Sequence, residues 1–161
     1  MDYFNKIYKE NYLIVKNVAY KITADSDATL DIVQEVFLSY FNSLKSKTKI
    51  NHPRTWLYRV TLNKCYDYIK SKHKITNVNL ENIELLSYTP ANNDDKSRYL
   101  HLALSMLKPK EKLLIILYSE GLSYKELSEV TEIKFTSIGQ TLSRTLKKLK
   151  NELKTKEYEL F

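Results

Sequence analysis

The stretch that decides the fold reads GLSYKELSEVTEIKFTSIGQTLSRTLKK and covers residues 121–148. Its apolar residues recur at helical spacing on both sides of a short polar turn. The first helix is expected to bury Leu127 and Val130, and the second to bury Ile138 and Leu142, which are four residues apart. Two short helices joined by a tight turn are typical of a helix-turn-helix.

The other face of the second predicted helix is polar and basic. Short polar side chains and one arginine can reach base edges in a DNA groove, and lysines can meet phosphates. The candidate DNA-binding residues on this face are Lys134, Ser137, Gln140, Ser143, Arg144, Lys147 and Lys148. The pattern alone fits an ordinary helical hairpin with a solvated face equally well, because such hairpins are common.

The residues before this motif are also helical. Ser123 and Glu126 have the spacing of a capping box. Pro109 suits the first position of the preceding helix, and Gly121 suits the residue just after its end. A further amphipathic helix is expected over residues 96–107. The second half of the chain is therefore predicted to be entirely α-helical.

Three more helices are predicted in the first half of the chain: residues 3–23, residues 28–44, and a helix from Pro53 to about Ser71. Residues 74–95 break the periodicity and collect Asn and Asp, as a linker does. With two glycines and three prolines, the chain has few residues for tight hairpins. We expect an all-α fold of two small helical domains joined by a flexible linker.

The positive charge of the chain is concentrated in one segment. The net charge is +7, whereas residues 45–75 alone carry 9 basic and 1 acidic residues, a net charge of +8. A dense field of one sign suits a polyanion such as nucleic acid. A lysine-rich surface that meets only water is the alternative.

The stretch DIVQEVFLSYF, residues 31–41, has two stripes at helical spacing. Asp25 or Asp27 is the expected N-cap of its helix. The expected buried stripe consists of Leu30, Val33, Phe37 and Phe41. The second stripe consists of Asp31, Gln34, Glu35 and Leu38. By pattern alone, the second stripe is best read as a solvated face.

Several classes of protein are disfavoured by composition. Cys65 is the only cysteine, so no disulfide can form within one chain, and we expect a protein of the reducing cytoplasm. We find neither a signal peptide pattern nor a run of 18 apolar residues. His52 and His73 belong to no cluster with metal-ligand spacing. Without a phosphate loop or a nucleophile–base motif, we expect neither a catalytic residue, nor a cofactor, nor an enzyme.

Taken together, the blocks resemble a known family. TLDIVQEVFLSYF followed by PRTWLYRVTLNKCYDYIKSKHK resembles region 2 of bacterial sigma-70-family RNA polymerase sigma factors. LKPKEKLLIILYSEGLSYKELSEVTEIKFTSIGQTLSRTLKKLK resembles region 4. The two blocks, with no residues left for other regions, resemble the extracytoplasmic-function (group IV) class. The resemblance implies a region 2 domain over residues 1–75, a linker over 76–95 and a region 4 domain over 96–161.

The resemblance also implies partners and contact residues. Region 2 of the family docks on the β′ clamp helices of core polymerase, and the matching residues are Asp31, Gln34, Glu35 and Leu38. The same region captures a flipped base of the non-template strand at the −10 element. The residues that match this function are Lys45, Lys47, Lys49, Asn51, Trp56, Arg59, Val60, Asn63 and Lys64. Trp56 is equally well explained by core packing.

Region 4 of the family reads the −35 duplex and lies near the β flap. The resemblance therefore assigns to the −35 element the candidate residues Lys134, Ser137, Gln140, Ser143, Arg144, Lys147 and Lys148. An anti-sigma protein that binds between the two domains is a further partner known for the class. This chain departs from the family pattern at Glu132, where glycine is usual, and at Gly139 and Thr141, where basic residues are frequent.

Three functions remain to be separated. A sigma factor accounts for both blocks and for their order. A helix-turn-helix regulator that ignores polymerase accounts for residues 121–148 but leaves the Asp31 stripe and the basic segment unexplained. An enzyme would need a motif that the sequence does not offer.

Overall fold

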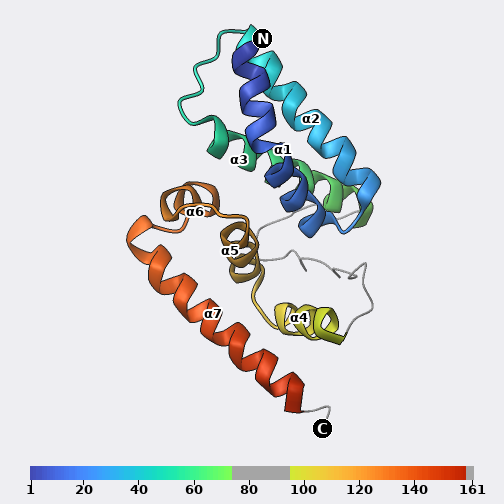
Figure 1. Cartoon of the computed structure of the whole chain (residues 1–161), viewed down its shortest axis with the longest axis vertical. Coiled ribbons are helices and arrows are strands. Elements are labelled where there is room, and N and C mark those ends of the chain that lie inside the picture. Colours follow the sequence, from blue (N-terminus) through green and yellow to red (C-terminus); the bar gives the residue numbers. More distant parts are fainter. Residues whose placement is uncertain (74–94, 159–161) are drawn as a thin grey trace. The chain divides into compact units, whose positions relative to one another are not determined.

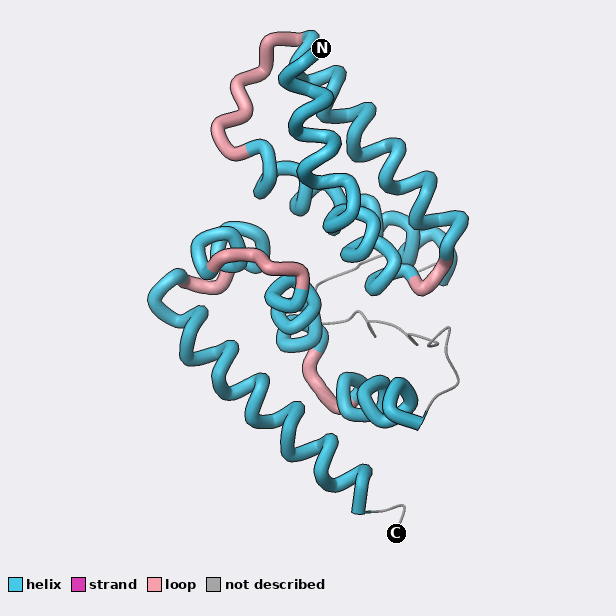
Figure 2. Tube along the Cα trace, viewed as in Figure 1, coloured by secondary structure: helices cyan, strands magenta, loops and turns pink. Residues whose placement is uncertain are grey.

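The computed structural model describes residues 1–73 and 95–158 (Figures 1 and 2). Over these ranges the chain forms helices and short connections, and no strand. The helices are α1 (Asp2–Thr23), α2 (Ser26–Lys45), α3 (Pro53–His73), α4 (Asp95–Ser105), α5 (Pro109–Ser119), α6 (Tyr124–Thr131) and α7 (Phe135–Tyr158). The prediction of an all-α fold is confirmed. The expected linker, residues 76–95, lies almost entirely outside the described residues.

The chain divides into two compact units, Met1–Asn77 and Val78–Phe161. In the first unit, α1, α2 and α3 each pack against the other two (Figure 1). Their shared core contains Val18 and Ile22 from α1, Val36 from α2, and Leu57 and Cys65 from α3. In the second unit, α7 packs against α4, α5 and α6.

The buried face of α2 differs from the predicted one. Leu30, expected in the apolar stripe, is 50% exposed, whereas Ile32, Val36 and Tyr40 are buried. Because α2 packs on both α1 and α3, it buries a broad face, and a residue two positions from Ile32 lies about 200° around the helix. The inclusion of Leu30 in the buried stripe was therefore wrong.

The start of α2 is fixed by one carboxylate. Asp25, one of the two expected caps, is the N-cap, and its Oδ1 accepts a hydrogen bond of 2.9 Å from the Ala28 N–H. Its Oδ2 accepts a second bond of 2.7 Å from the Tyr68 hydroxyl on α3. The bond from Ala28, and then the bond from Tyr68, lower the pKa of Asp25. The bond to Asp25 in turn raises the pKa of Tyr68 to about 12. This carboxylate ties α2 to α3.

Local signals set the ends of the helices in the second unit. The predicted capping box opens α6: Ser123 Oγ accepts from the Glu126 N–H at 3.2 Å, and Glu126 Oε2 accepts from the Ser123 N–H at 2.7 Å. Gly121, just after α5, has φ 84°. Glu132 ends α6 with φ 62°, a left-handed conformation that is unfavourable for a residue with a side chain. The last helix, α7, continues to Tyr158.

Candidate nucleic-acid and partner-protein interfaces

The polar stripe of α2 is an exposed surface. Its members all face solvent, on the side of the helix opposite Val36, and they are Asp31, Gln34, Glu35 and Leu38. Leu38 is 56% exposed, and the exposed Leu30 extends the same surface by one turn. Leu30, expected in the core, thus belongs to this exposed surface. The face offers carboxylates and an amide between two apolar side chains.

An ion pair connects this surface to α3. Lys64 Nζ lies 2.8 Å from Glu35 Oε2, and the two side chains are 35% and 56% exposed, respectively. The hydrogen bond to Glu35 raises the pKa of Lys64, which keeps its ammonium charged. The family resemblance assigns Glu35 to a protein-binding surface and Lys64 to a DNA-binding one. The structure brings the two into contact.

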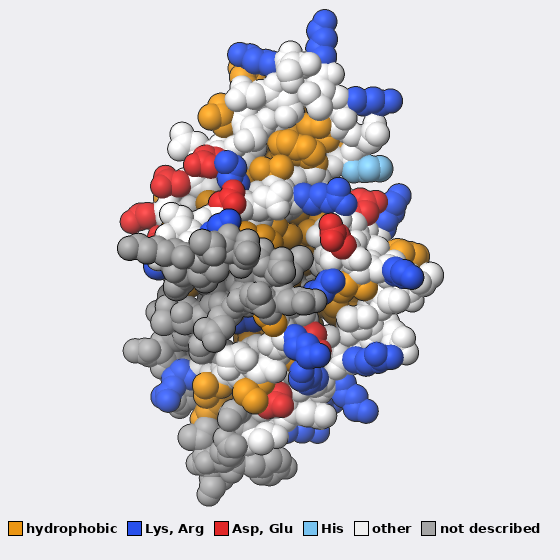
Figure 3. Space-filling view, turned by 180° about the vertical axis from the view of Figure 1, so that it is seen from behind, with side chains coloured by type: hydrophobic (Ala, Val, Ile, Leu, Met, Phe, Trp, Pro, Cys, Tyr) orange, Lys and Arg blue, Asp and Glu red, His pale blue; other side chains and the backbone are white. Residues whose placement is uncertain are grey.

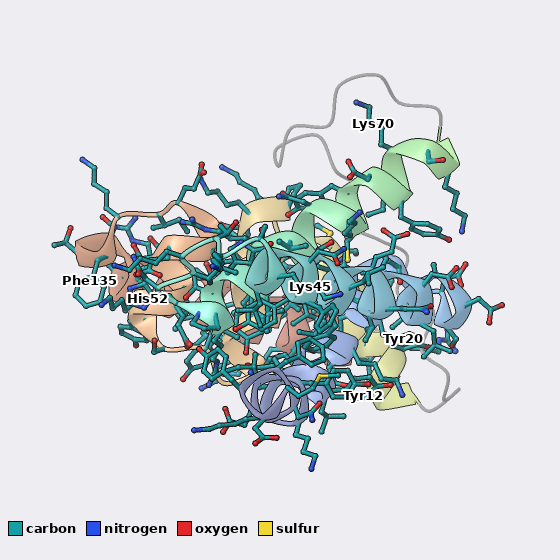
Figure 4. All side chains as sticks on the ribbon, turned by 90° about the horizontal axis from the view of Figure 1, so that it is seen from above. Tyr12, Tyr20, Lys45, His52, Lys70 and Phe135 are labelled. Atoms are coloured by element: carbon teal, nitrogen blue, oxygen red, sulfur yellow. The ribbon has the colours of Figure 1, made fainter. Side chains whose placement is uncertain are left out.

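The connection between α2 and α3 presents the predicted basic loop. Lys45, Lys47, Lys49 and Asn51 are all exposed on it. Lys47 adopts a left-handed conformation with φ 55°, and the Lys45 ammonium lies 4.7 Å from the centre of the Phe41 ring. Figure 4 labels Lys45 and His52, which lie at the two ends of this loop. The loop can therefore present several ammonium groups to a polyanion.

The start of α3 contributes one aromatic side chain and several polar ones. Trp56 is half-buried, with its ring centre 5.6 Å from that of Tyr40. Part of its ring thus packs on the core while part remains accessible. Arg59 and Asn63 are exposed and Val60 is half-buried. A partly exposed aromatic beside amide and guanidinium groups can stack on an unpaired base and hydrogen-bond to it.

The polar face of α7 is as predicted, with two exceptions in exposure. Five of the candidate DNA-binding residues are exposed: Lys134, Gln140, Ser143, Arg144 and Lys147. Ser137 is half-buried, and Lys148 is half-buried and pairs with Glu111 of α5 at 3.1 Å. The opposite face of the helix buries Ile138, Leu142 and Thr145. Phe135, which the sequence analysis did not select, is 59% exposed.

Other kinds of site receive no support from the described residues. In the part of the chain that the structure describes, no group of three His, Cys, Asp or Glu side chains could hold a metal ion. Among the same residues, no helix is both long enough and apolar enough to cross a membrane.

Lys and Arg side chains are more widespread than Asp and Glu on the face drawn in Figure 3.

Comparisons with known proteins match both halves of the chain. Residues 7–75 match the family model described as Sigma-70 region 2, and residues 97–149 match Sigma-70, region 4. RNA polymerase sigma factor SigV of Bacillus subtilis (strain 168) is 30% identical over 141 residues, covering 87% of this chain and 84% of SigV.

Two further relatives cover nearly all of the chain. The ECF RNA polymerase sigma factor SigE of Mycolicibacterium smegmatis is 24% identical over 166 residues, which are 95% of this chain and 62% of SigE. A solved structure of the sigma factor RpoE with the anti-sigma factor NepR, from Bartonella quintana, has the same fold. It has a TM-score of 0.69 and 20% identity, covering 96% of this chain and 98% of that one. The chain therefore belongs to the sigma-70 family of RNA polymerase sigma factors and is of the extracytoplasmic-function type.

Proposed function

We propose that this chain binds core RNA polymerase through the exposed α2 face and directs it to promoters through α3 and α7. The α2 face carries the proposal furthest, because it combines Asp31, Gln34, Glu35 and Leu38 on one side of a helix whose other side is buried. A regulator that contacts only DNA would not explain this exposed acidic and amide face on α2. The sigma factor function accounts for both this face and the basic segment.

Contact with polymerase would rest on charge and shape. The family docks on the arginine-bearing clamp helices of the β′ subunit. A guanidinium can bind a carboxylate such as that of Asp31 with two parallel hydrogen bonds. Leu38, which is 56% exposed, would lose its contact with water on docking. In region 4, Leu114 and Leu117 are buried, and Tyr118, 42% exposed, would face the β flap.

Promoter opening would use binding energy alone. The loop and α3 would hold the non-template strand at the −10 element through Lys45, Lys47, Lys49, Asn51, Trp56, Arg59, Val60 and Asn63. Lys64 would join them once its ammonium is released from Glu35. Extruding a base costs a few kcal/mol of lost stacking and pairing. Stacking on an aromatic such as Trp56 returns about 1–3 kcal/mol per base. Capture of flipped bases thereby favours the open duplex, and the chain itself catalyses no reaction.

At the −35 element, α7 would enter the major groove. Gln140 and Arg144 would hydrogen-bond to base edges, and Lys134 and Lys147 would contact phosphates. The left-handed Glu132 forms the turn without the glycine that is usual in the family. Lys148 keeps its bond to Glu111 at 3.1 Å and contributes less to DNA than its neighbours.

We further propose that residues 1–75, 76–95 and 96–161 act as region 2, linker and region 4 in the cytoplasm, without a cofactor. An anti-sigma protein is a third proposed partner, since the solved relative is described in complex with one. A helix-turn-helix regulator that works without polymerase is the alternative. It is not favoured, because both family models match in order along the chain.

Run-off transcription tests the proposal. Purified chain and core polymerase are incubated with a library of promoter fragments, and a promoter-specific transcript is expected. If the chain binds duplex DNA tightly but yields no specific transcript, the regulator function replaces the sigma factor function. Asp31→Lys should abolish core binding with an unchanged thermal midpoint. Glu10→Lys, which reverses an exposed charge on α1, is the matched control and should bind core normally.

A further inference from the structure

Phe135, the first residue of α7, is exposed over 59% of its surface, although its helix buries Ile138 and Leu142. The side chain is labelled in Figure 4. A single exposed apolar residue needs no explanation by itself. The position of Phe135 in the helix-turn-helix is the reason to consider a function for it.

The backbone around Phe135 is held in place on both sides. The Ser128 hydroxyl donates a hydrogen bond of 2.6 Å to the Ile133 carbonyl, which fixes the turn to α6. The Ser137 N–H donates to the Lys134 carbonyl at 2.8 Å, which closes the first turn of α7. The Phe135 ring is therefore attached to a defined point of the motif.

The neighbours of Phe135 have the chemistry of a DNA contact. Lys134 and Thr136 are exposed on either side of it, and Gln140 and Arg144 are exposed farther along α7. The positive charges of Lys134 and Arg144 attract phosphates. In a helix-turn-helix, the first residues of the second helix approach base edges in the major groove. Phe135 thus lies where bases are read.

Gly139 leaves the start of this side of α7 without a polar side chain next to Phe135. It lies four residues after Phe135 and hence on the same side of the helix. A Cβ at this position would lie 3.4 Å from Cε2 of Tyr124, and no other neighbour would come within 4 Å. Tyr124, itself 45% exposed, adds a second aromatic surface here. No side chain at position 139 can hydrogen-bond to a base, so the part of this side from Phe135 to Gly139 offers apolar contact.

We propose that Phe135 is a specificity-determining residue that packs against the C5-methyl group of a thymine in the −35 element. The thymine methyl is the apolar group that base edges present in the major groove, and phenylalanine is among the side chains that contact it. The inference rests on the proposed function of α7 at the −35 element. It adds a residue and a base preference to that function.

Removal of single methyl groups from DNA tests the contact. Holoenzyme made from the full chain and core polymerase first selects −35 elements from a randomised promoter library. Each thymine of the selected element is then replaced singly by deoxyuridine, which lacks only the methyl group. With the wild type, at least one replacement should weaken equilibrium binding about fourfold, the factor expected for one methylene-sized contact.

Variants assign that effect to Phe135. Phe135→Ala should bind the thymine promoter at least about fourfold more weakly, and the same deoxyuridine replacement should then have no further effect. Phe135→Leu, which keeps an apolar side chain, should retain most of the methyl effect. Because the ring is exposed, the thermal midpoint of either variant should match that of the wild type. An unchanged deoxyuridine effect in Phe135→Ala would overturn the inference.

Arg144→Ala separates this inference from the proposed function. It should weaken binding to every template, with or without deoxyuridine. If it leaves promoter binding unchanged, α7 does not read the −35 element and the proposed function fails there. If it weakens binding while no selected thymine methyl matters to the wild type, only the assignment to Phe135 is refuted.

Discussion

Replacement of Glu35 by glutamine should make DNA binding by the free protein more sensitive to salt. In the wild type, the Lys64 ammonium is held by the Glu35 carboxylate at 2.8 Å. Glutamine keeps the size of the side chain but removes the negative charge. The ammonium of Lys64 is then free to contact a phosphate.

The size of the effect follows from the release of one ammonium group. Each additional phosphate contact steepens the dependence of log K on log salt by about 0.9 for duplex DNA and about 0.7 for a single strand. When the salt concentration falls from about 200 mM to about 50 mM, the affinity of each protein for duplex DNA should rise. The fold-increase for the variant should be about 3.5 times that for the wild type. The fold itself should lose little, about 0.2–1 kcal/mol, because both partners of the pair are partly exposed.

Fluorescence anisotropy with a labelled promoter fragment, titrated at several salt concentrations without polymerase, measures these slopes. Asp31→Asn is the matched control, because it removes the same charge from the same exposed face. It should shift affinity slightly but leave the slope unchanged. Glu35→Gln combined with Lys64→Gln should return the slope to that of the wild type.

Two outcomes would refute this reasoning. One is an equal slope for Glu35→Gln and Asp31→Asn, which would mean that only the overall charge matters. The other is a steep slope that persists in the double variant, which would mean that Lys64 is not the released group.

Four further predictions concern the fold. Asp25→Ala should lower the thermal midpoint more than Asp25→Asn, because asparagine can still accept the Ala28 N–H, and equal midpoints would contradict this. The pKa of Asp25 in the folded protein lies below its ordinary value of 3.8. The ionised carboxylate therefore stabilises the fold at neutral pH, and this stabilisation is lost as the pH falls through the lowered pKa. The difference in thermal midpoint between wild type and Asp25→Asn should accordingly disappear in strong acid. Burial raises the pKa of the Cys65 thiol to about 12. A maleimide should therefore label Cys65 near pH 8 only in molecules that have unfolded. Rapid labelling of the native protein would contradict the burial of this thiol. Glu132→Gly should raise the free energy of unfolding in a urea titration by about 1 kcal/mol, because φ is 62°, whereas a loss of stability would exclude strain at this turn.

Signals that lie within a few residues of each other were read correctly from the sequence. The capping box of Ser123 and Glu126 and the glycine after α5 each follow from local backbone chemistry. Glu132, with φ 62°, stands where the family pattern has glycine. These features need no knowledge of which helices pack together.

Features that depend on packing were missed. The spacing of Leu30 with Val33 looked like an apolar stripe, but Ile32, Val36 and Tyr40 form the buried face because α2 has helices on two sides. The ion pair between Glu35 and Lys64 joins side chains from different helices, so no local pattern could reveal it.

The two faces of α7 have a consequence for how promoter preference can diverge among relatives. Gln140, Ser143 and Arg144 are exposed, whereas Ile138 and Leu142 form the core. Substitutions on the exposed face should therefore alter the preferred promoter at little cost in folding free energy. Promoter preference can then change through single mutations, after each of which the protein still folds. Lys148 is an exception, because a change there also breaks its bond to Glu111.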